Sequence, residues 1–598
     1  MPVDARAAYS ARHADRAQRA TRLAARERRI GNARLIVFGI GVVLAWAALA
    51  QRWVPAWTIT VPAALFAGLV IAHARLIPHR RAAERAAAFY AAGLARLDDR
   101  WAGHGRSGAE HADAAHPYSA DLDLFGPGSL FELLCTARTH SGATRLAAWL
   151  CAPAPADEVR ARQAAVDELR ARLDLREQLA ALGEAFGDEL DLVALAAWGE
   201  APPRLQSAAL RAIAAVLVAV SAATLALWQL AGGRAWPFGA AVAACALFGL
   251  ALRTRVRAVV KEVDRPGREL ELLSTLLERV EREPVAAPRL LALRAVLDTT
   301  GAAPSVRIAQ LERTVGLLDA RRNQFFAPLA PFLLWQTQCA LAIEAWRAAC
   351  GPAIRGWCDA LADFEALAAL SCYAYEHPHD PFPELVTGAA RYEGSGLGHP
   401  LLPAAQCVRN DVRLGPDCAA LVISGSNMSG KSTLLRTLGV NAVLAQAGAP
   451  VRATRLCLTP LAIGTSMRVA DSLQTGTSRF YAEIQRLKQL VDLAHGALPL
   501  CFLLDEVLHG TNSHDRRVGA EAVVRGLVAR GAIGCITTHD LSLAHIADAL
   551  APRAANVHFA DHLEHGTMRF DYRMQPGIVQ HSNALALMRA VGLEVDDA

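Results

Sequence analysis

The stretch Ala419-Ala-Leu-Val-Ile-Ser-Gly-Ser-Asn-Met-Ser-Gly-Lys-Ser-Thr433 decides the fold of the C-terminal part of the chain. Its first six residues predict a short buried parallel strand, and residues 434–443 predict a helix that follows. The residues between them fill the phosphate-loop pattern G-x-x-x-x-G-K-[ST]. A bare pattern of this kind can occur by chance, but the strand and the helix on either side argue against a chance match. The stretch therefore predicts a site for a nucleoside triphosphate.

The residue types of the loop suit phosphate and magnesium chemistry. Backbone N–H groups at a glycine-rich turn and at a helix N-terminus face the phosphates, Lys431 reaches their oxygens, and the Ser432 hydroxyl can ligate Mg²⁺. We expect ATP and Mg²⁺ as ligands, with Asp505 as a second metal residue. The expected nucleotide-binding residues are Gly425, Ser426, Asn427, Met428, Ser429, Gly430, Lys431, Ser432 and Thr433.

Two later strands carry the expected catalytic residues. The apolar run 500–504 ends in Asp505 and Glu506, which resembles a Walker B strand. Asp505 would hold Mg²⁺ through water, and Glu506 would polarise the attacking water. Residues 532–538 form another strand that ends at His539, which can contact the γ-phosphate. Alone, an acid pair or a histidine at a strand end is often only a solvated residue, so the assignment depends on the loop.

Length and composition indicate the number of domains, the role of the N-terminal arm and the redox compartment. With 598 residues, and about 150 residues for a typical domain, several domains are expected. The net charge of +5 is mildly basic, but the first thirty-odd residues are rich in arginine. This arm could bind nucleic acid or anionic lipid, or could set the orientation of a membrane segment, which we favour. The 12 cysteines include no C-x-x-C pair, which indicates a reducing compartment and no zinc site.

Hydropathy predicts two transmembrane hairpins. Apolar segments occupy 35–50 and 57–72, and a second pair occupies 213–227 and 236–252. With their flanks they approach the ~20 residues that cross a bilayer. The alternatives are core helices of a large α-domain, or a signal peptide for the first segment; paired spacing and interfacial tryptophans favour spans. Basic flanks place both termini and the soluble parts in the cytoplasm, at the inner membrane. A fifth apolar segment, 325–345, contains Glu344 and two glutamines and favours a packed helix.

Several motifs resemble the MutS family of DNA mismatch repair proteins. They are the loop at 425–433 with its Asn427-Met428 pair, Asp505-Glu-Val-Leu-His-Gly-Thr-Asn512, Thr537-Thr-His-Asp540, Gly398-His-Pro400, Val408-Arg-Asn-Asp411 and Asp471-Ser-Leu-Gln-Thr-Gly-Thr-Ser-Arg-Phe480. The last segment resembles the family's signature loop. The resemblance implies that Ser478 reaches the γ-phosphate of the partner subunit, so that Glu506, His539 and Ser478 in trans are the catalytic set of a homodimer. It extends upstream through Asp121-Leu-Asp-Leu-Phe125 and residues 131–166.

The departures from the family bear on function. The resemblance includes no N-terminal mismatch-recognition domain, and the second hairpin interrupts the helical core where the family extends a DNA clamp. Ser426 and Ser429 replace the usual proline and glycine of the loop without removing a phosphate or magnesium ligand. ATP binding is therefore expected to persist, whereas mismatch recognition by this chain is not.

The predicted architecture is an α plus α/β multidomain protein. An all-helical MutS-like core and lever carries the transmembrane hairpins, and an ABC-type P-loop NTPase domain follows it. The expected parts are a basic arm (1–34), hairpin 1 (35–77), helical core (78–207), hairpin 2 (208–253), further core and lever (254–389) and the ATPase domain (390–598).

Two classes of function remain open at this point. The first is a membrane-anchored MutS-like ATPase that binds DNA, with a repair protein as a further partner. The second is an ATP-driven membrane remodelling or transport-like assembly that does not act on DNA. An ABC transporter is disfavoured because the Leu-Ser-Gly-Gly-Gln signature is absent from the sequence.

Overall fold

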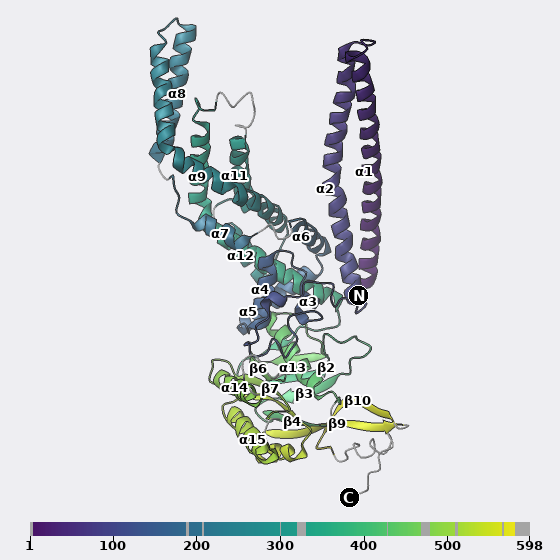
Figure 1. The fold of residues 1–598 in the computed structure, drawn as a ribbon. Helices are drawn as coiled ribbons and strands as arrows, with labels where there is room; N and C mark the ends of the chain where they lie inside the picture. Colours follow the sequence, from purple (N-terminus) through teal and green to yellow (C-terminus); the bar gives the residue numbers. More distant parts are fainter. Residues whose placement is uncertain are drawn as a thin grey trace.

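A computed structural model describes residues 4–579 apart from 187–190, 206–207, 299–300, 320–329, 427, 468–478, 509–511 and 565–566. Helices occupy the chain as far as Glu376, and strands alternate with helices after it. This confirms the predicted order of an all-helical part followed by an α/β part. Two long helical hairpins stand apart from each other and project from a helical body in the same direction, and the α/β part lies at the opposite end of that body (Figure 1).

The helical part contains twelve α-helices in its described residues. They are α1 (Ala5–Leu49), α2 (Thr60–Leu97), α3 (Leu130–Leu134), α4 (His140–Cys151), α5 (Ala156–Arg170), α6 (Leu173–Phe186), α7 (Leu192–Glu200), α8 (Ala208–Leu230), α9 (Trp236–Glu281), α10 (Pro288–Leu297), α11 (Pro304–Asp319) and α12 (Trp335–Glu376). Hairpin 1 is α1 with α2. Hairpin 2 is α8 with the first half of α9 (Figure 1).

The helices of both hairpins cross the predicted domain boundaries without a break. The basic arm and the first apolar segment form the single helix α1, which starts at an N-cap where Asp4 accepts hydrogen bonds from the N–H groups of Arg6 and Ala7. Similarly, α9 continues past residue 253 as far as Glu281. Alanine, arginine and leucine all favour helix, so the composition changes at these points while the backbone does not.

The fifth apolar segment is packed into the protein core over its C-terminal residues, from Cys339 onward. Residues 325–329 lie outside the described residues, and the segment is helical from Trp335 as the start of α12. Glu344 is 1% exposed, accepts the N–H of Arg204 at 2.5 Å and pairs with Arg347 at 3.1 Å. A buried and paired carboxylate of this kind suits a protein core.

The α/β part contains two sheets. The larger has the order β10-β9-β4-β8-β7-β6, in which only β10 is antiparallel to its neighbour. The smaller has the order β1-β5-β2-β3. The strands are β1 (Glu384–Leu385), β2 (Tyr392–Leu397), β3 (Asn410–Leu414), β4 (Ala420–Ser424), β5 (Arg455–Leu458), β6 (Ala462–Ser466), β7 (Leu500–Asp505), β8 (Ile533–Thr538), β9 (Ala554–Glu564) and β10 (Thr567–Pro576), and the helices are α13 (Lys431–Ala447), α14 (Arg479–Leu493), α15 (Ser513–Ala529) and α16 (His545–Ala549).

Candidate nucleotide-binding site

The phosphate loop leaves the carboxyl end of a central strand. All five residues of β4 are buried, and β4 lies between the parallel strands β8 and β9. The helix α13 begins at Lys431 directly after Gly430, whose φ is 102°. A Cβ at Gly430 would lie 3.0 Å from the ring of Tyr572, so this position needs glycine for its backbone and for its space. The loop thus joins a buried strand to the N-terminus of a helix, which is the geometry of an anion site.

Lys431 lies folded against the loop. It is 4% exposed, and its ammonium donates to the carbonyl oxygens of Gly425 at 2.8 Å and Ser426 at 2.7 Å. The carboxylate of Glu506 lies 3.8 Å away. Burial lowers the pKa of Lys431, while Glu506 and Asp505 oppose that shift. A phosphate group would offer this ammonium a stronger acceptor than the two carbonyls do.

Two serine hydroxyls of the loop are suited to a ligand. Within the described part of the chain, the side-chain oxygens of Ser426 and Ser429 are buried and have no hydrogen-bond partner. Buried hydroxyls are normally paired, so two unpaired ones beside an ammonium and a helix N-terminus fit the oxygens of a bound triphosphate. The residues present therefore fit ATP. Ser432 would hold Mg²⁺ together with Asp505, and the ion would supply positive charge on the phosphate oxygens.

The acidic strand end lies next to this loop. Asp505 is the last residue of β7, and its carboxylate accepts the hydroxyl of Thr537 at 2.5 Å. The next residue, Glu506, has a positive φ of 49°, and its N–H lies 3.2 Å from both the carbonyl and the hydroxyl oxygen of Thr537. Its carboxylate lies 3.1 Å from Nδ1 of His539. The structure thus brings Lys431, Glu506 and His539 together.

The other predicted site residues either lie away from this cluster or fall outside the described residues. Asn427 and Ser478 lie outside the described residues. Met428 is 84% exposed with a φ of 72°, so its side chain points to solvent. Ser432 and Thr433 occupy the first turn of α13.

Sequence reasoning missed an aromatic residue beside the loop. Tyr572 lies on β10 at a register irregularity, has a φ of 55° and is 43% exposed. Asn410 holds this irregularity in place, because its side chain donates to the carbonyl of Tyr572 at 3.0 Å and accepts the N–H of Met574 at 2.8 Å. No local pattern connects residues this far apart in sequence, although Asn410 lies inside a recognised motif.

A segment of the helical part also contacts the nucleotide domain. Asp121 is 3% exposed, and its carboxylate accepts the hydroxyl of Thr465 at 2.6 Å and the N–H of Met467 at 3.1 Å. These contacts fix the end of β6, immediately before the residues that contain Ser478. An open cavity of about 380 Å³ between this segment and α13 is lined by Asp123, His399, Thr433 and Arg436, among others. Burial lowers the pKa of His399 to about 4, so this ring is neutral at physiological pH.

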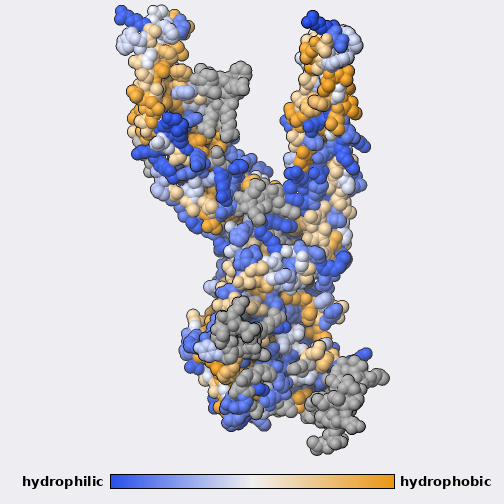
Figure 2. Space-filling view, viewed as in Figure 1, coloured by the Kyte–Doolittle hydropathy of each residue, from blue (hydrophilic) through white to orange (hydrophobic). Residues whose placement is uncertain are grey.

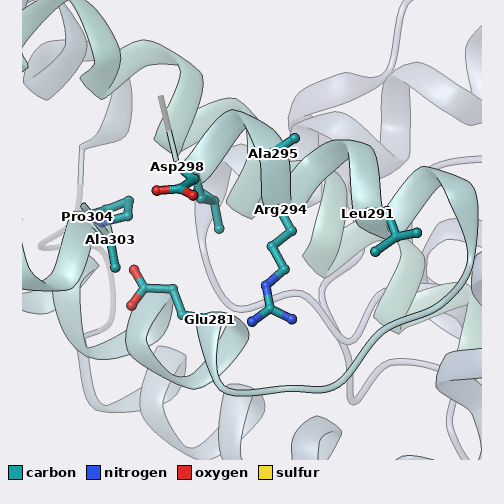
Figure 3. A pocket seen from close by; sticks show the side chains of 8 residues that line it. Glu281, Leu291, Arg294, Ala295, Asp298, Ala303 and Pro304 are labelled. Atoms are coloured by element: carbon teal, nitrogen blue, oxygen red, sulfur yellow. The ribbon is translucent and has the colours of Figure 1, made fainter. Parts of the chain in front are cut away.

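A larger cavity lies far from the loop, in the helical part. It has a volume of about 430 Å³ and lies between the end of α9, α10 and the start of α11. Figure 3 shows Glu281 and Arg294 among its lining side chains. The Glu281 carboxylate is engaged by the N–H and hydroxyl of Ser305, so it caps α11 rather than facing an open site.

Comparison with known proteins assigns the family. Residues 421–595 match the family model described as MutS domain V. Endonuclease MutS2 of Thermus thermophilus is 32% identical over 213 residues, which cover 34% of this chain and 26% of that protein. DNA mismatch repair protein MutS of Myxococcus xanthus is 28% identical over 514 residues, covering 78% and 56%. DNA mismatch repair protein MutS 2 of Halobacterium salinarum is 33% identical over 240 residues, covering 39% and 26%.

Residues 421–595 therefore form a domain of the MutS family, as the motifs in this part of the chain indicated. The matched region spans between about a quarter and just over half of the length of these relatives.

Proposed function

We propose that this protein is a membrane-anchored ATPase that binds and hydrolyses ATP with Mg²⁺ in a composite homodimer. The observation that carries the proposal is the convergence of Lys431, Glu506 and His539 beside the phosphate loop. Glu506 is placed to orient and polarise a water molecule, and His539 to sense the terminal phosphate through Glu506. Lys431 and the unpaired hydroxyls of Ser426 and Ser429 bind and orient the phosphates.

Turnover and binding of ATP by the full-length protein in detergent test this assignment. Glu506→Gln is expected to lower the turnover number by about 100-fold or more while ATP still binds. Lys431→Ala is expected to weaken binding itself by roughly tenfold or more. The matched control is Glu521→Gln, which removes a carboxylate that pairs with Arg525 on the same helix, α15. Normal turnover in Glu506→Gln would reject its role.

The composite site has its own test. Ser478→Ala is expected to bind ATP normally but to lose turnover. Mixing Ser478→Ala with Lys431→Ala protein should then restore activity, because one of the two sites in a mixed dimer contains both intact residues. Activity that is no higher in the mixture than in either variant alone would reject the contribution in trans.

Exposed apolar surface supports membrane anchoring. Four helices are long and apolar enough to cross a membrane, and only 6–17% of each apolar window is buried in the protein. Figure 2 shows an apolar band on each hairpin at a similar height, above polar surface on the stems. Extensive exposed apolar surface of this kind is typical of a membrane-contacting or partner-binding region. Large side chains in the bands are more than half exposed: Leu35, Val43, Trp53, Trp57, Trp236 and Leu247.

The hairpins would hold the nucleotide domain away from the bilayer. About thirty residues of α1 lie between its start at Ala5 and the apolar band, which corresponds to roughly 45 Å of helix. Basic side chains below the bands favour the cytoplasm for both termini and the nucleotide domain, at the inner membrane. Thiol labelling of intact cells should therefore leave the nucleotide domain protected.

DNA binding is proposed from family membership. Salt-dependent binding of duplexes, junctions and mispaired DNA to the detergent-solubilised protein, with and without ATP, tests it. Since phosphate contacts are strongest at low salt, a lack of binding there would reject it. The four exposed apolar helices would then favour the alternative, in which the ATPase dimer moves the hairpins within the membrane.

A further inference from the structure

A basic surface lies on the stem of each hairpin, just below its apolar band. Residues 19–34, 73–85, 211 and 253–262 contain fifteen arginine and lysine residues and three glutamates. Their local net charge is therefore +12, in a chain whose whole net charge is +5. The excess positive charge of the protein is thus concentrated on these two stems.

Six exposed arginines of this surface lie near the bands, and we call them the basic collar. They are Arg28, Arg29 and Arg75 on hairpin 1, and Arg253, Arg255 and Arg257 on hairpin 2. Arg253 directly follows the apolar segment of α9, and Arg28 lies seven residues, about 10 Å of helix, below the start of the band on α1. Headgroups extend about 5–7 Å beyond the hydrocarbon on each side, a distance that arginine side chains can bridge.

The collar arginines differ in their partners from two of the arginines near them. Within the described residues, none of the six collar guanidinium groups forms an ion pair. Nearby arginines outside the collar do: Arg80 contacts Glu27 and Glu84 at 2.6 Å, and Arg204 contacts Glu262 at 2.5 Å. The positive charge of the collar is therefore not neutralised by carboxylates of the described residues.

The arrangement on hairpin 2 favours a bound anion. Arg253 and Arg257 are four residues apart on one face of α9, where like charges repel. Exposed cations in this geometry are stabilised by an anion between them, and arginine holds phosphate through paired N–H donors. A phosphate diester at the membrane surface meets both requirements.

We propose that the basic collar binds the headgroups of anionic phospholipids in the leaflet that faces the nucleotide domain. The inference rests on the proposed insertion of the hairpins. Both stems take part, because Figure 2 places polar surface directly beneath the apolar band on each of them. The protein would thus prefer a membrane region rich in anionic lipid, independently of what its ATPase acts on.

The experiment measures lipid selectivity by electron paramagnetic resonance. The full-length protein is reconstituted in phosphatidylcholine vesicles that contain either spin-labelled phosphatidylglycerol or spin-labelled phosphatidylcholine. We expect phosphatidylglycerol to be enriched roughly two- to fivefold in the motionally restricted fraction, with the enrichment falling as salt rises. Changing Arg253, Arg255 and Arg257 to glutamine should lower the enrichment, and changing all six collar arginines should abolish it.

A matched control removes three exposed arginines from the smaller sheet of the nucleotide domain: Arg391, Arg413 and Arg455. This variant should keep full selectivity. Equal restricted fractions for both lipids, or full selectivity in the six-glutamine variant, would overturn the proposal. A duplex DNA that binds the detergent-solubilised protein and is lost from the six-glutamine variant, without lipid selectivity, would also overturn it. Failure of membrane insertion is distinguishable, because neither labelled lipid would then show a restricted fraction.

Discussion

The two hairpins look alike, but they are joined to the helical body in different ways. Hairpin 1 is attached at its base by buried polar groups: Arg96 contacts Glu376 at 2.6 Å, and Tyr9 donates to the same carboxylate at 3.2 Å. Arg16 contacts Glu177 of α6 at 2.7 Å. Hairpin 2 instead continues into the body through α9, whose Val263 and Leu273 are completely buried in the main apolar core.

Each hairpin therefore depends on a different part of the protein for its attachment. Hairpin 1 is oriented by directional bonds to α6 and to the last turn of α12, beside a small apolar cluster that includes Tyr9 and Tyr90. Losing these bonds should release the hairpin while the core stays folded. Hairpin 2 shares a continuous helix with the core, so the same degree of damage to its base should destabilise the core itself.

The largest expected effect comes from the buried ion pair of hairpin 1. Glu376→Ala leaves Arg96 buried without its partner, which should weaken docking of the hairpin by about 3–5 kcal/mol. Hydrogen exchange should then increase in residues 5–20 and not in α9. The control Glu278→Ala removes the exposed ion pair with Arg282 and should change stability by under about 1 kcal/mol. Equal exchange throughout both helices would contradict the distinction between the hairpins.

The corresponding change in hairpin 2 is Leu273→Ala. It opens a cavity in the main core and should lower the free energy of unfolding by about 2–5 kcal/mol. Here exchange should increase across α9, α11 and α12 together, which pack against one another. Leu291→Ala serves as the control because Leu291 is 47% exposed. If exchange increased in α9 alone, hairpin 2 and the core would unfold independently, which would contradict the expected coupling.

Tyr9→Phe tests the hydrogen bond of the Tyr9 hydroxyl separately from the packing of its ring. It removes the hydroxyl that donates to Glu376 and contacts Cys372, and should weaken docking by about 1.5 kcal/mol. Tyr375→Phe is the matched control, since the Tyr375 hydroxyl is buried without a partner among the described residues. If Tyr9→Phe weakens docking no more than Tyr375→Phe does, the hydrogen bond does not hold hairpin 1, and the ring stacking of Tyr9 on Tyr375, which both variants keep, carries the contact instead.

The smallest expected effect is a difference in how acid pH changes the stability of the two hairpins at their points of attachment. Burial opposes ionisation of Glu376, but Arg96 outweighs it and holds the pKa of Glu376 below its ordinary value. Its stabilising contribution is present above that ordinary value, about 4.3, and is lost as the pH falls through the lower folded pKa. In α9, burial raises the pKa of Glu269 against the effect of Arg265. The contribution of Glu269 is therefore full below about 4.3 and is lost as pH rises through its folded pKa.

Hydrogen exchange at acid and neutral pH measures this difference. On acidification, α1 should lose protection relative to α9. Glu376→Gln should remove the pH dependence from hairpin 1 alone, and Glu269→Gln from α9 alone. A parallel loss of protection in both hairpins would trace the response to general charge repulsion.

Much of the architecture could be predicted because it is encoded locally. The glycines and Lys431 of the phosphate loop are neighbours in sequence, and hydropathy marks the apolar segments of both hairpins from composition alone. The domain boundaries were harder to place, because Ala, Arg and Leu continue one helix through the basic arm of α1 and through residue 253 of α9.

What the sequence alone determined is the family, the chemistry of the phosphate loop and the apolar segments, since each depends on residues close together along the chain. Only the tertiary structure decided that Glu376 joins Tyr9 and Arg96, that Tyr572 lies against Gly430, and that Asp121 holds the end of β6. These contacts connect residues that are more than a hundred positions apart in the sequence. They follow from how whole helices and sheets pack, and no local periodicity encodes that packing.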